Sequence, residues 1–415
     1  MRLLWLCNIA PGAVKEKLYG GASIGGLWID HVLSDLMEED LELRILCPGK
    51  PGQGRLNDQV DYATFQEPCA YRYEKELEAW FRREIRDFQP DVLHIWGSEY
   101  GHTLAMVNAA KQEGRLESVA VSIQGLCSVY TRHYLEGLPR QVQRGATLRD
   151  LLRRDTLLRQ QEKFRLRGEL EIAALRQVPH VIGRTSWDRA CTQAIAPQAQ
   201  YHFCNETLRE PFYQGAWDYS ACRKHRVFAS SCVYPIKGFH YLLEAMGEVV
   251  KTYPDATIGV PGRSFLAKTA GEKLRANRYE VYLAELARKY HLEDRIDFLG
   301  SLSAEQMKAE YLKANVFVLP STVENSPNSL GEAMLLGVPC VSADVGGVTD
   351  LMTPGTEGRV YPGNAPYLMA YHIRELFAME ETAGILGRTA REHAGRTHDP
   401  KINKETLLQI YRQLS

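Results

Sequence analysis

Short apolar runs alternate with longer amphipathic stretches along this chain, and that alternation predicts parallel strands joined by helices. In the most regular example, the run Val316–Leu319 predicts a buried strand that Pro320 ends. Apolar residues then recur on one helical face at Leu330, Met334 and Leu335. Gly337 suits the C-cap of that helix, and Val338–Val341 begins another apolar run. The segment therefore predicts a strand, a loop, a helix and a second strand.

The N-terminal half shows the same alternation. Leu3–Ile9 predicts a first strand, and the glycine-rich stretch Gly20–Gly26 predicts a loop before a helix. Gln89–His94 predicts a later strand, and the amphipathic helix before it carries an apolar face of Leu77, Trp80, Phe81 and Ile85. The whole chain therefore predicts an α/β protein.

Two carboxylates follow the predicted strand at Val316–Leu319: Glu324 lies in the loop and Glu332 in the helix. Open parallel sheets bind ligands at the carboxyl ends of their strands, and a helix N-terminus there suits a phosphate group. Each carboxylate also has a simpler interpretation. Ser329 and Glu332 have the spacing of a capping box, and Glu324 fits a solvated loop carboxylate equally well.

The segment from Val316 to Asp350 resembles the C-terminal signature of family 4 glycosyltransferases, which contains a Glu-x7-Glu motif, a Gly-x-Pro-x-Val strand entry and a later Gly-Gly pair. Phe228–Ala245 is similar to the family's first C-domain strand and the helix that follows its phosphate-binding lysine, and Ile296–Gly300 resembles a later strand. The resemblance implies the GT-B fold, which has two Rossmann-like domains with parallel sheets facing each other across a cleft. We expect an N-terminal acceptor domain at 1–208, completed by a C-terminal helix at about 400–415, and a donor domain at 209–399.

The resemblance also implies roles for individual residues. Glu324 would act in catalysis by binding a hydroxyl of the donor sugar. His94 would lie near the cleft as a second catalytic residue, unless it is a packed core histidine. The other expected donor-binding residues are Lys237 on the phosphate, Glu332 on the ribose, and Asn328, Ser329, Leu330, Leu302 and Gly25. On the acceptor side we expect Gly21 and Gln124.

Two departures from the family pattern concern the site. Cys232 stands where the family usually has an arginine, and Gln124 stands where it often has a histidine. The stretches Gly183–Ala190 and Cys204–Tyr213 nevertheless resemble a subgroup that assembles bacterial polysaccharides.

Composition agrees with a two-domain enzyme and excludes several other classes. The chain has 415 residues, of which 45% are hydrophobic and 24% charged, and its formal net charge of −1 argues against general nucleic-acid binding. Its nine cysteines form no C-x-x-C pair, so neither a zinc site nor a disulfide framework is indicated. No run of about 18 apolar residues is present to span a bilayer, and no signal peptide is indicated. We expect a cytoplasmic protein.

One segment is strongly basic. Residues 140–176 contain ten Lys or Arg and five Asp or Glu, with leucines interleaved, and this pattern predicts an amphipathic helix with a basic face. Such a face could dock on the inner surface of the cell membrane, beside a lipid-linked acceptor, or could be an ordinary solvated surface.

Together these features predict a retaining glycosyltransferase that uses a nucleotide sugar, UDP- or GDP-linked, and a glycan or polyprenyl-linked acceptor in polysaccharide synthesis. We expect no metal and no other cofactor, because no D-x-D pair is present and Lys237 can neutralise the leaving group. A GT-B sugar-nucleotide epimerase and a non-catalytic nucleotide-sugar-binding protein remain as alternatives. The base, the sugar, the linkage and the oligomeric state are not legible in the sequence.

Overall fold

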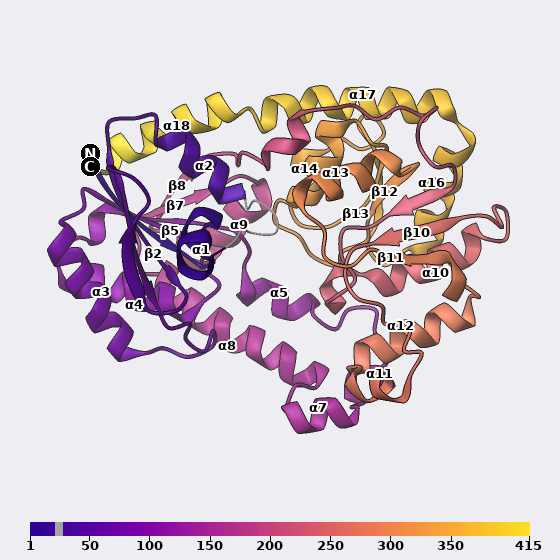
Figure 1. Cartoon of the computed structure of the whole chain (residues 1–415), viewed down its shortest axis with the longest axis horizontal. Coiled ribbons are helices and arrows are strands. Elements are labelled where there is room, and N and C mark those ends of the chain that lie inside the picture. The colour runs from indigo at the N-terminus through magenta and orange to yellow at the C-terminus, as the bar shows by residue number, and fades with distance from the viewer. Residues whose placement is uncertain (21–27) are drawn as a thin grey trace. The chain divides into compact units, whose positions relative to one another are not determined.

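The computed structural model describes residues 1–20 and 28–415, which fold into two compact α/β units (Figure 1). Unit 1 comprises residues 1–131, 163–209 and 398–415, and unit 2 comprises residues 132–162 and 210–397. Within the described part of the chain, no helix is long and apolar enough to cross a bilayer.

Unit 1 is built on a sheet of eight strands in the order β3-β4-β2-β1-β5-β6-β7-β8. Only β3 runs antiparallel to its neighbour, and the other pairings are parallel. The strands are β1 (Arg2–Cys7), β2 (Glu42–Pro48), β3 (Gly52–Arg55), β4 (Val60–Phe65), β5 (Val92–Trp96), β6 (Val119–Ser122), β7 (His180–Gly183) and β8 (Gln200–Phe203). The central strands are buried along almost their whole length, as expected for a parallel sheet with helices on both faces.

The helices of unit 1 are amphipathic or buried elements that cover this sheet. They are α1 (Gly12–Tyr19), α2 (Trp28–Leu36), α3 (Lys75–Phe88), α4 (Gly101–Gln112), α9 (Ser186–Ile195) and α18 (Pro400–Leu414), together with most of α5 (Cys127–His133) and α8 (Leu157–Leu175). Residues 132–133 of α5 and 157–162 of α8 belong to unit 2. The last of them, α18, belongs to unit 1 although it ends the chain, and its Tyr411 is fully buried in the core beside Trp5.

Unit 2 contains an all-parallel sheet in the order β11-β10-β9-β12-β13-β14. Its strands are β9 (Arg226–Phe228), β10 (Thr257–Val260), β11 (Ile296–Phe298), β12 (Val316–Leu319), β13 (Cys340–Asp344) and β14 (Arg359–Pro362). Its helices are α6 (Arg140–Arg144), α7 (Leu148–Arg153), α10 (Phe239–Val249), α11 (Ala270–Arg275), α12 (Arg278–Lys289), α13 (Ala304–Lys313), α14 (Asn328–Leu336), α15 (Val348–Leu351), α16 (Pro366–Ala378) and α17 (Glu380–Thr397). The two units confirm the predicted fold class of two Rossmann-like α/β domains.

Residues 132–162 lie in unit 2, whereas the sequence placed them in the first domain. The physical reason is local packing: Leu138, Val142 and Leu157 are buried in the unit 2 core. The single helix expected over residues 140–176 is also wrong. The segment forms α6, α7 and α8, because backbone turns at Gly145 and Arg154 interrupt it.

Candidate functional site

The loop after β12 holds Glu324 at the carboxyl end of the unit 2 sheet. Its Oε1 lies 2.6 Å from Lys237 Nζ and accepts a 2.8 Å hydrogen bond from the Ser321 hydroxyl. The Glu324 side chain is 9% exposed and that of Lys237 is 33% exposed. The structure therefore brings together two residues that the sequence placed in the donor site, and it excludes a solvated loop carboxylate for Glu324.

Two glycines with positive φ hold the backbone around Glu324. At Gly238 (φ +64) an added Cβ would lie 1.8 Å from the Pro320 carbonyl oxygen, and at Gly346 (φ +55) it would lie 1.6 Å from the Glu324 carbonyl oxygen. Any other residue would collide with backbone at both places. The turn Pro235–Lys237, which ends at Gly238, and the turn at Gly346 therefore both pack closely against the backbone of the Glu324 loop.

Helix α14 begins at Asn328, so Asn328, Ser329 and Leu330 form its first turn. The residue before it is Pro327, and within this described helix no side chain caps the N-terminus. The capping-box interpretation of Ser329 and Glu332 is therefore wrong, because Ser329 lies inside the helix. Glu332 follows in the next turn and is 4% exposed. The N-terminus of α14 thus presents backbone amides and a positive dipole end at the edge of the sheet that carries Glu324.

Leu302 and Arg263 of unit 2 form no hydrogen bond or ion pair with Lys237 or Glu324 in the described part of the chain. Leu302 is half-buried in the loop after β11, at the same sheet edge, but two strands, β10 and β9, lie between β11 and β12. Arg263, in the loop after β10, is mostly exposed and pairs with Glu280 at 2.5 Å.

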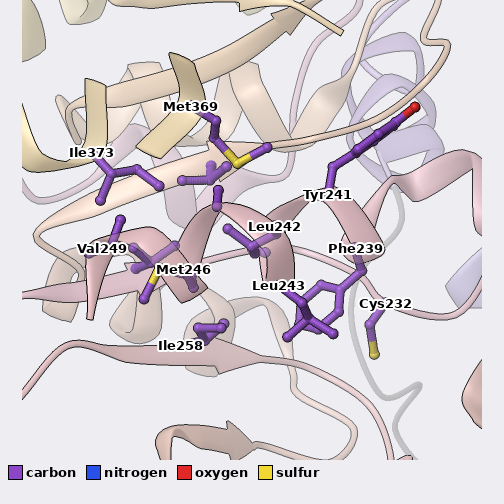
Figure 2. Close-up of a cluster of buried hydrophobic side chains, with 14 of the residues drawn as sticks. Cys232, Phe239, Tyr241, Leu242, Leu243, Met246, Val249, Ile258, Met369 and Ile373 are labelled. Carbon is purple, nitrogen blue, oxygen red and sulfur yellow. The ribbon is translucent and has the colours of Figure 1, made fainter. Parts of the chain in front are cut away.

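Cys232 does not replace the cation that the family pattern has at its position. Its side chain is buried in the unit 2 core near Phe239 and Leu243, as Figure 2 shows. Burial raises the pKa of the Cys232 thiol to about 12, so the thiol is neutral at physiological pH. Lys237 is therefore the cation paired with Glu324 in this site.

His94 lies in the core of unit 1 rather than on an open surface. It is 1% exposed, its Nδ1 lies 2.6 Å from the Tyr411 hydroxyl, and its Nε2 lies 2.7 Å from the Ser122 hydroxyl. Burial lowers the pKa of His94 to about 3, so the ring is neutral. This geometry is that of the packed core histidine, and it corrects the catalytic role expected for His94, because both ring nitrogens are occupied by structural partners.

Gln124 is part of a polar network at the carboxyl end of β6. Its Nε2 donates to Glu206 at 2.9 Å, and Arg184 donates to its Oε1 at 3.1 Å. Arg184 and Glu206 also form a 3.0 Å ion pair in which both side chains are less than a tenth exposed. The expected acceptor-side residue is thus held by a buried charged pair.

Gln124 also lines a cavity of about 210 Å³ in unit 1, together with Asn8, Glu99, Tyr100 and Arg167 among others. The Asn8 amide donates to Glu99 at 2.8 Å, and loss of water around Glu99 raises the pKa of its carboxyl group. These residues were not singled out from the sequence. Asn8 directly follows β1 and Glu99 lies three residues after β5, so the strand-end rule could have found them. Arg167 belongs to the basic segment 140–176, but no sequence pattern linked it to this cavity.

Gly21 and Gly25, the remaining expected site residues, lie outside the described part of the chain.

Comparison with known sequences points to one family. Residues 223–393 match the family model described as Glycosyl transferases group 1. A D-inositol 3-phosphate glycosyltransferase of Corynebacterium urealyticum is 27% identical over 179 residues, which cover 43% of this chain and 41% of that relative. A putative colanic acid biosynthesis glycosyltransferase, WcaL of Salmonella typhimurium, is 30% identical over 141 residues, which cover 32% of this chain and 35% of that relative. The matches thus span well under half the length of these relatives, and they support the resemblance to glycosyltransferases.

Solved structures resemble the whole chain. Sucrose-phosphate synthase from Thermosynechococcus elongatus aligns with a TM-score of 0.72 at 17% identity, covering 100% of this chain and 99% of that one. Anabaena HepE in complex with UDP-glucose aligns with a TM-score of 0.68 at 16% identity, covering 100% and 99%. At this level of identity the likeness shows the fold, which is GT-B.

Proposed function

We propose that the protein is a glycosyltransferase that moves a sugar from a nucleoside diphosphate sugar to a glycan or lipid-linked glycan acceptor, with retention of configuration and without a metal ion. The observation that carries this proposal is the pairing of Lys237 with Glu324 at the carboxyl end of β12. It stands in a unit that matches the group 1 glycosyltransferases over residues 223–393. A cation and a carboxylate at one sheet edge suit a ligand that has both phosphate and hydroxyl groups.

The Lys237–Glu324 ion pair can separate when a donor binds. A diphosphate would draw Lys237 Nζ onto its oxygens, beside the backbone amides at the start of α14. Glu324 would then accept hydrogen bonds from hydroxyls of the donor sugar and stabilise positive charge that develops on the ring. Glu332, one turn into α14, would bind the ribose. In this scheme Lys237 and the helix N-terminus stabilise the leaving diphosphate, which is the role that a metal ion has in other transferases.

The donor and the setting are also part of the proposal. HepE has been solved with UDP and with UDP-glucose, which makes a uridine-linked donor the first to test. The similarity to a putative colanic acid biosynthesis enzyme supports a place in polysaccharide assembly. A lipid-linked acceptor would bring the protein to the cytoplasmic face of the cell membrane.

Thermal stabilisation by nucleotides tests the donor site directly. UDP, GDP, ADP and CMP are added without metal to the wild type and to Glu332→Ala. A ligand at about one hundred times its Kd stabilises the fold by about 2.7 kcal/mol, so selective binding raises Tm measurably. We expect a shift with one diphosphate that Glu332→Ala abolishes. The absence of a shift with every nucleotide would contradict the proposed donor site.

Product analysis then separates transfer from the alternatives. The matching nucleotide sugar, incubated with EDTA and a glycan acceptor, should yield a glycoside whose anomeric configuration equals that of the donor. Formation of an epimeric nucleotide sugar without acceptor would instead identify an epimerase.

A further inference from the structure

Helix α7 exposes leucines that its position in the fold leaves uncovered. Leu148, Leu151 and Leu152 are 58%, 62% and 78% exposed. Their spacing of three and four residues places them on one face of the helix. The helix is firmly formed, since Thr147 and Asp150 make a complete capping box and Arg154 ends it in a left-handed conformation. The exposed leucines therefore belong to an ordered element.

A second segment, far away in the sequence, extends this surface. Helix α11 packs against α7, and Figure 1 shows the two together at the periphery of unit 2. Its Leu274 is 61% exposed. The buried carboxylate of Asp150 accepts a 2.9 Å hydrogen bond from the Arg278 amide, which fixes α7 to the chain just after α11. We call the four residues Leu148, Leu151, Leu152 and Leu274 the leucine knob.

Cations without acidic partners flank the leucines of the knob along the chain. They are exposed side chains on or beside α7, α8 and α11, and none forms an ion pair with another residue in the described ranges: Arg153, Arg154, Arg159, Lys273 and Arg275. Nearby acids are already engaged. Asp150 is a buried cap, Asp155 lies 3.3 Å from Arg149, and Glu272 caps α11. The surface therefore combines exposed leucines with neighbouring positive charges.

We propose that the leucine knob inserts into an anionic membrane surface, with the neighbouring cations on lipid phosphates. Apolar side chains flanked by Lys and Arg are the pattern of interfacial membrane binding, in which area and charge both contribute. A second copy of this chain suits the surface less well. In a two-fold interface the same patch meets itself, which would bring unpaired cations together.

The location of the knob relates it to the proposed donor site. Helix α11 lies in the connection that leaves the carboxyl end of β10, and β12, which leads to Glu324, runs parallel in the same sheet. Docking through the knob would therefore bring this edge of unit 2 to the bilayer. That consequence rests on the proposed function, because it suits a lipid-linked acceptor. The binding itself does not require enzymatic activity.

Co-sedimentation of the full chain with vesicles tests the proposal. Vesicles of phosphatidylcholine alone are compared with vesicles that also contain phosphatidylglycerol, at low and high salt. We expect binding to the anionic vesicles that weakens with salt. Leu151→Ser/Leu152→Ser should lower the partition coefficient at least about tenfold, because two leucine side chains no longer enter the interface. Arg153→Gln/Lys273→Gln should weaken binding and reduce its dependence on salt.

Matched controls separate docking from misfolding. Ile385→Ser removes another exposed apolar side chain, 47% exposed on α17 of the same unit, and should bind as the wild type does. All variants should keep the wild-type Tm, since the substituted side chains are exposed. The proposal would be overturned if the wild-type protein did not co-sediment with anionic vesicles. It would also be overturned if the leucine variants bound these vesicles as strongly as the wild type does. A wild-type dimer in sedimentation velocity that the leucine substitutions dissociate would overturn it in favour of a second copy.

The result is also independent of the nucleotide test. Vesicle binding without any nucleotide-induced Tm shift would keep the docking surface and reject the donor site. A nucleotide shift without vesicle binding would do the reverse.

Discussion

Lys237→Ala removes the cation that pairs with Glu324 and leaves that carboxylate with the Ser321 hydroxyl as its remaining side-chain partner within hydrogen-bond distance in the described site. Breaking a fully buried ion pair costs about 3–5 kcal/mol, whereas an exposed pair contributes about 0.2–1 kcal/mol. The Glu324 side chain is 9% exposed and that of Lys237 is 33% exposed, so the pair is intermediate. We expect the free energy of unfolding to fall by about 1–2 kcal/mol, measured by guanidinium denaturation.

The effect on catalysis should be larger than the effect on stability. A hydrogen bond from a charged donor to a phosphate contributes about 1.5–3 kcal/mol, which corresponds to a factor of about ten to a hundred in kcat/KM. The assay is the release of the nucleoside diphosphate from the nucleotide sugar identified by thermal shift. Lys251→Ala is the matched control. Lys251 follows α10 in the same unit, pairs with Glu248 at 2.7 Å and is 67% exposed.

A double variant tests whether the pair itself is responsible. In a Glu324→Gln background the carboxylate charge is gone, so Lys237→Ala should cost less stability than it does in the wild type. Unchanged kcat/KM in Lys237→Ala, with Lys251→Ala equally active, would refute the role of Lys237 in donor binding. Equal stability losses in both backgrounds would show that the two side chains are not coupled.

Two further predictions follow from the packing. Gly238→Ala would place a Cβ 1.8 Å from the Pro320 carbonyl oxygen, so we expect it to lower Tm clearly and to disturb donor binding, whereas Gly271→Ala, with open space around it, should leave both unchanged. An unaffected Tm in Gly238→Ala would contradict this close backbone packing at Gly238. His94 has a pKa of about 3 when folded and near 6.5 when unfolded, so its contribution to stability is complete above pH 6.5 and is lost as the pH falls toward 3. Between the two pKa values the free energy of unfolding falls by about 1.4 kcal/mol per pH unit, which denaturation between about pH 4 and pH 6 measures. His94→Gln should remove this share, whereas His291→Asn at an exposed site should keep it. A change in the pH profile of turnover in a folded His94→Gln variant would instead restore a catalytic role.

Much of unit 2 could be predicted from local sequence. The apolar run Val316–Leu319, the helical spacing after it and Gly337 specify β12 and α14, and the structure ends α14 at Leu336 with Gly337 in a left-handed conformation. Since parallel strands share the edge where they end, Lys237 and Glu324 were both expected at the carboxyl edge of this sheet, and the structure places their side chains 2.6 Å apart there. That edge could be predicted because the elements that form it are determined by short-range pattern.

Other assignments depended on residues that the pattern cannot bring together. His94 follows the family motif, yet its Nδ1 is held by the hydroxyl of Tyr411, which lies 317 positions away on α18. Cys232 is a neutral core residue because α10 packs over it, and no property of the nearby sequence shows that.

By itself, the sequence determined the alternation of strands and helices, the position of the donor-site motif and the class of chemistry that it resembles. Those features follow from periodicity and from the fixed direction of parallel strands. Only the tertiary structure decided which carboxylate pairs with which cation, which histidine is buried, and that residues 132–162 pack with unit 2. It also brought α11, which carries Leu274, against α7. The reason is that the local sequence does not specify which distant segments pack against each other. The burial and charge state of a residue depend on that long-range packing.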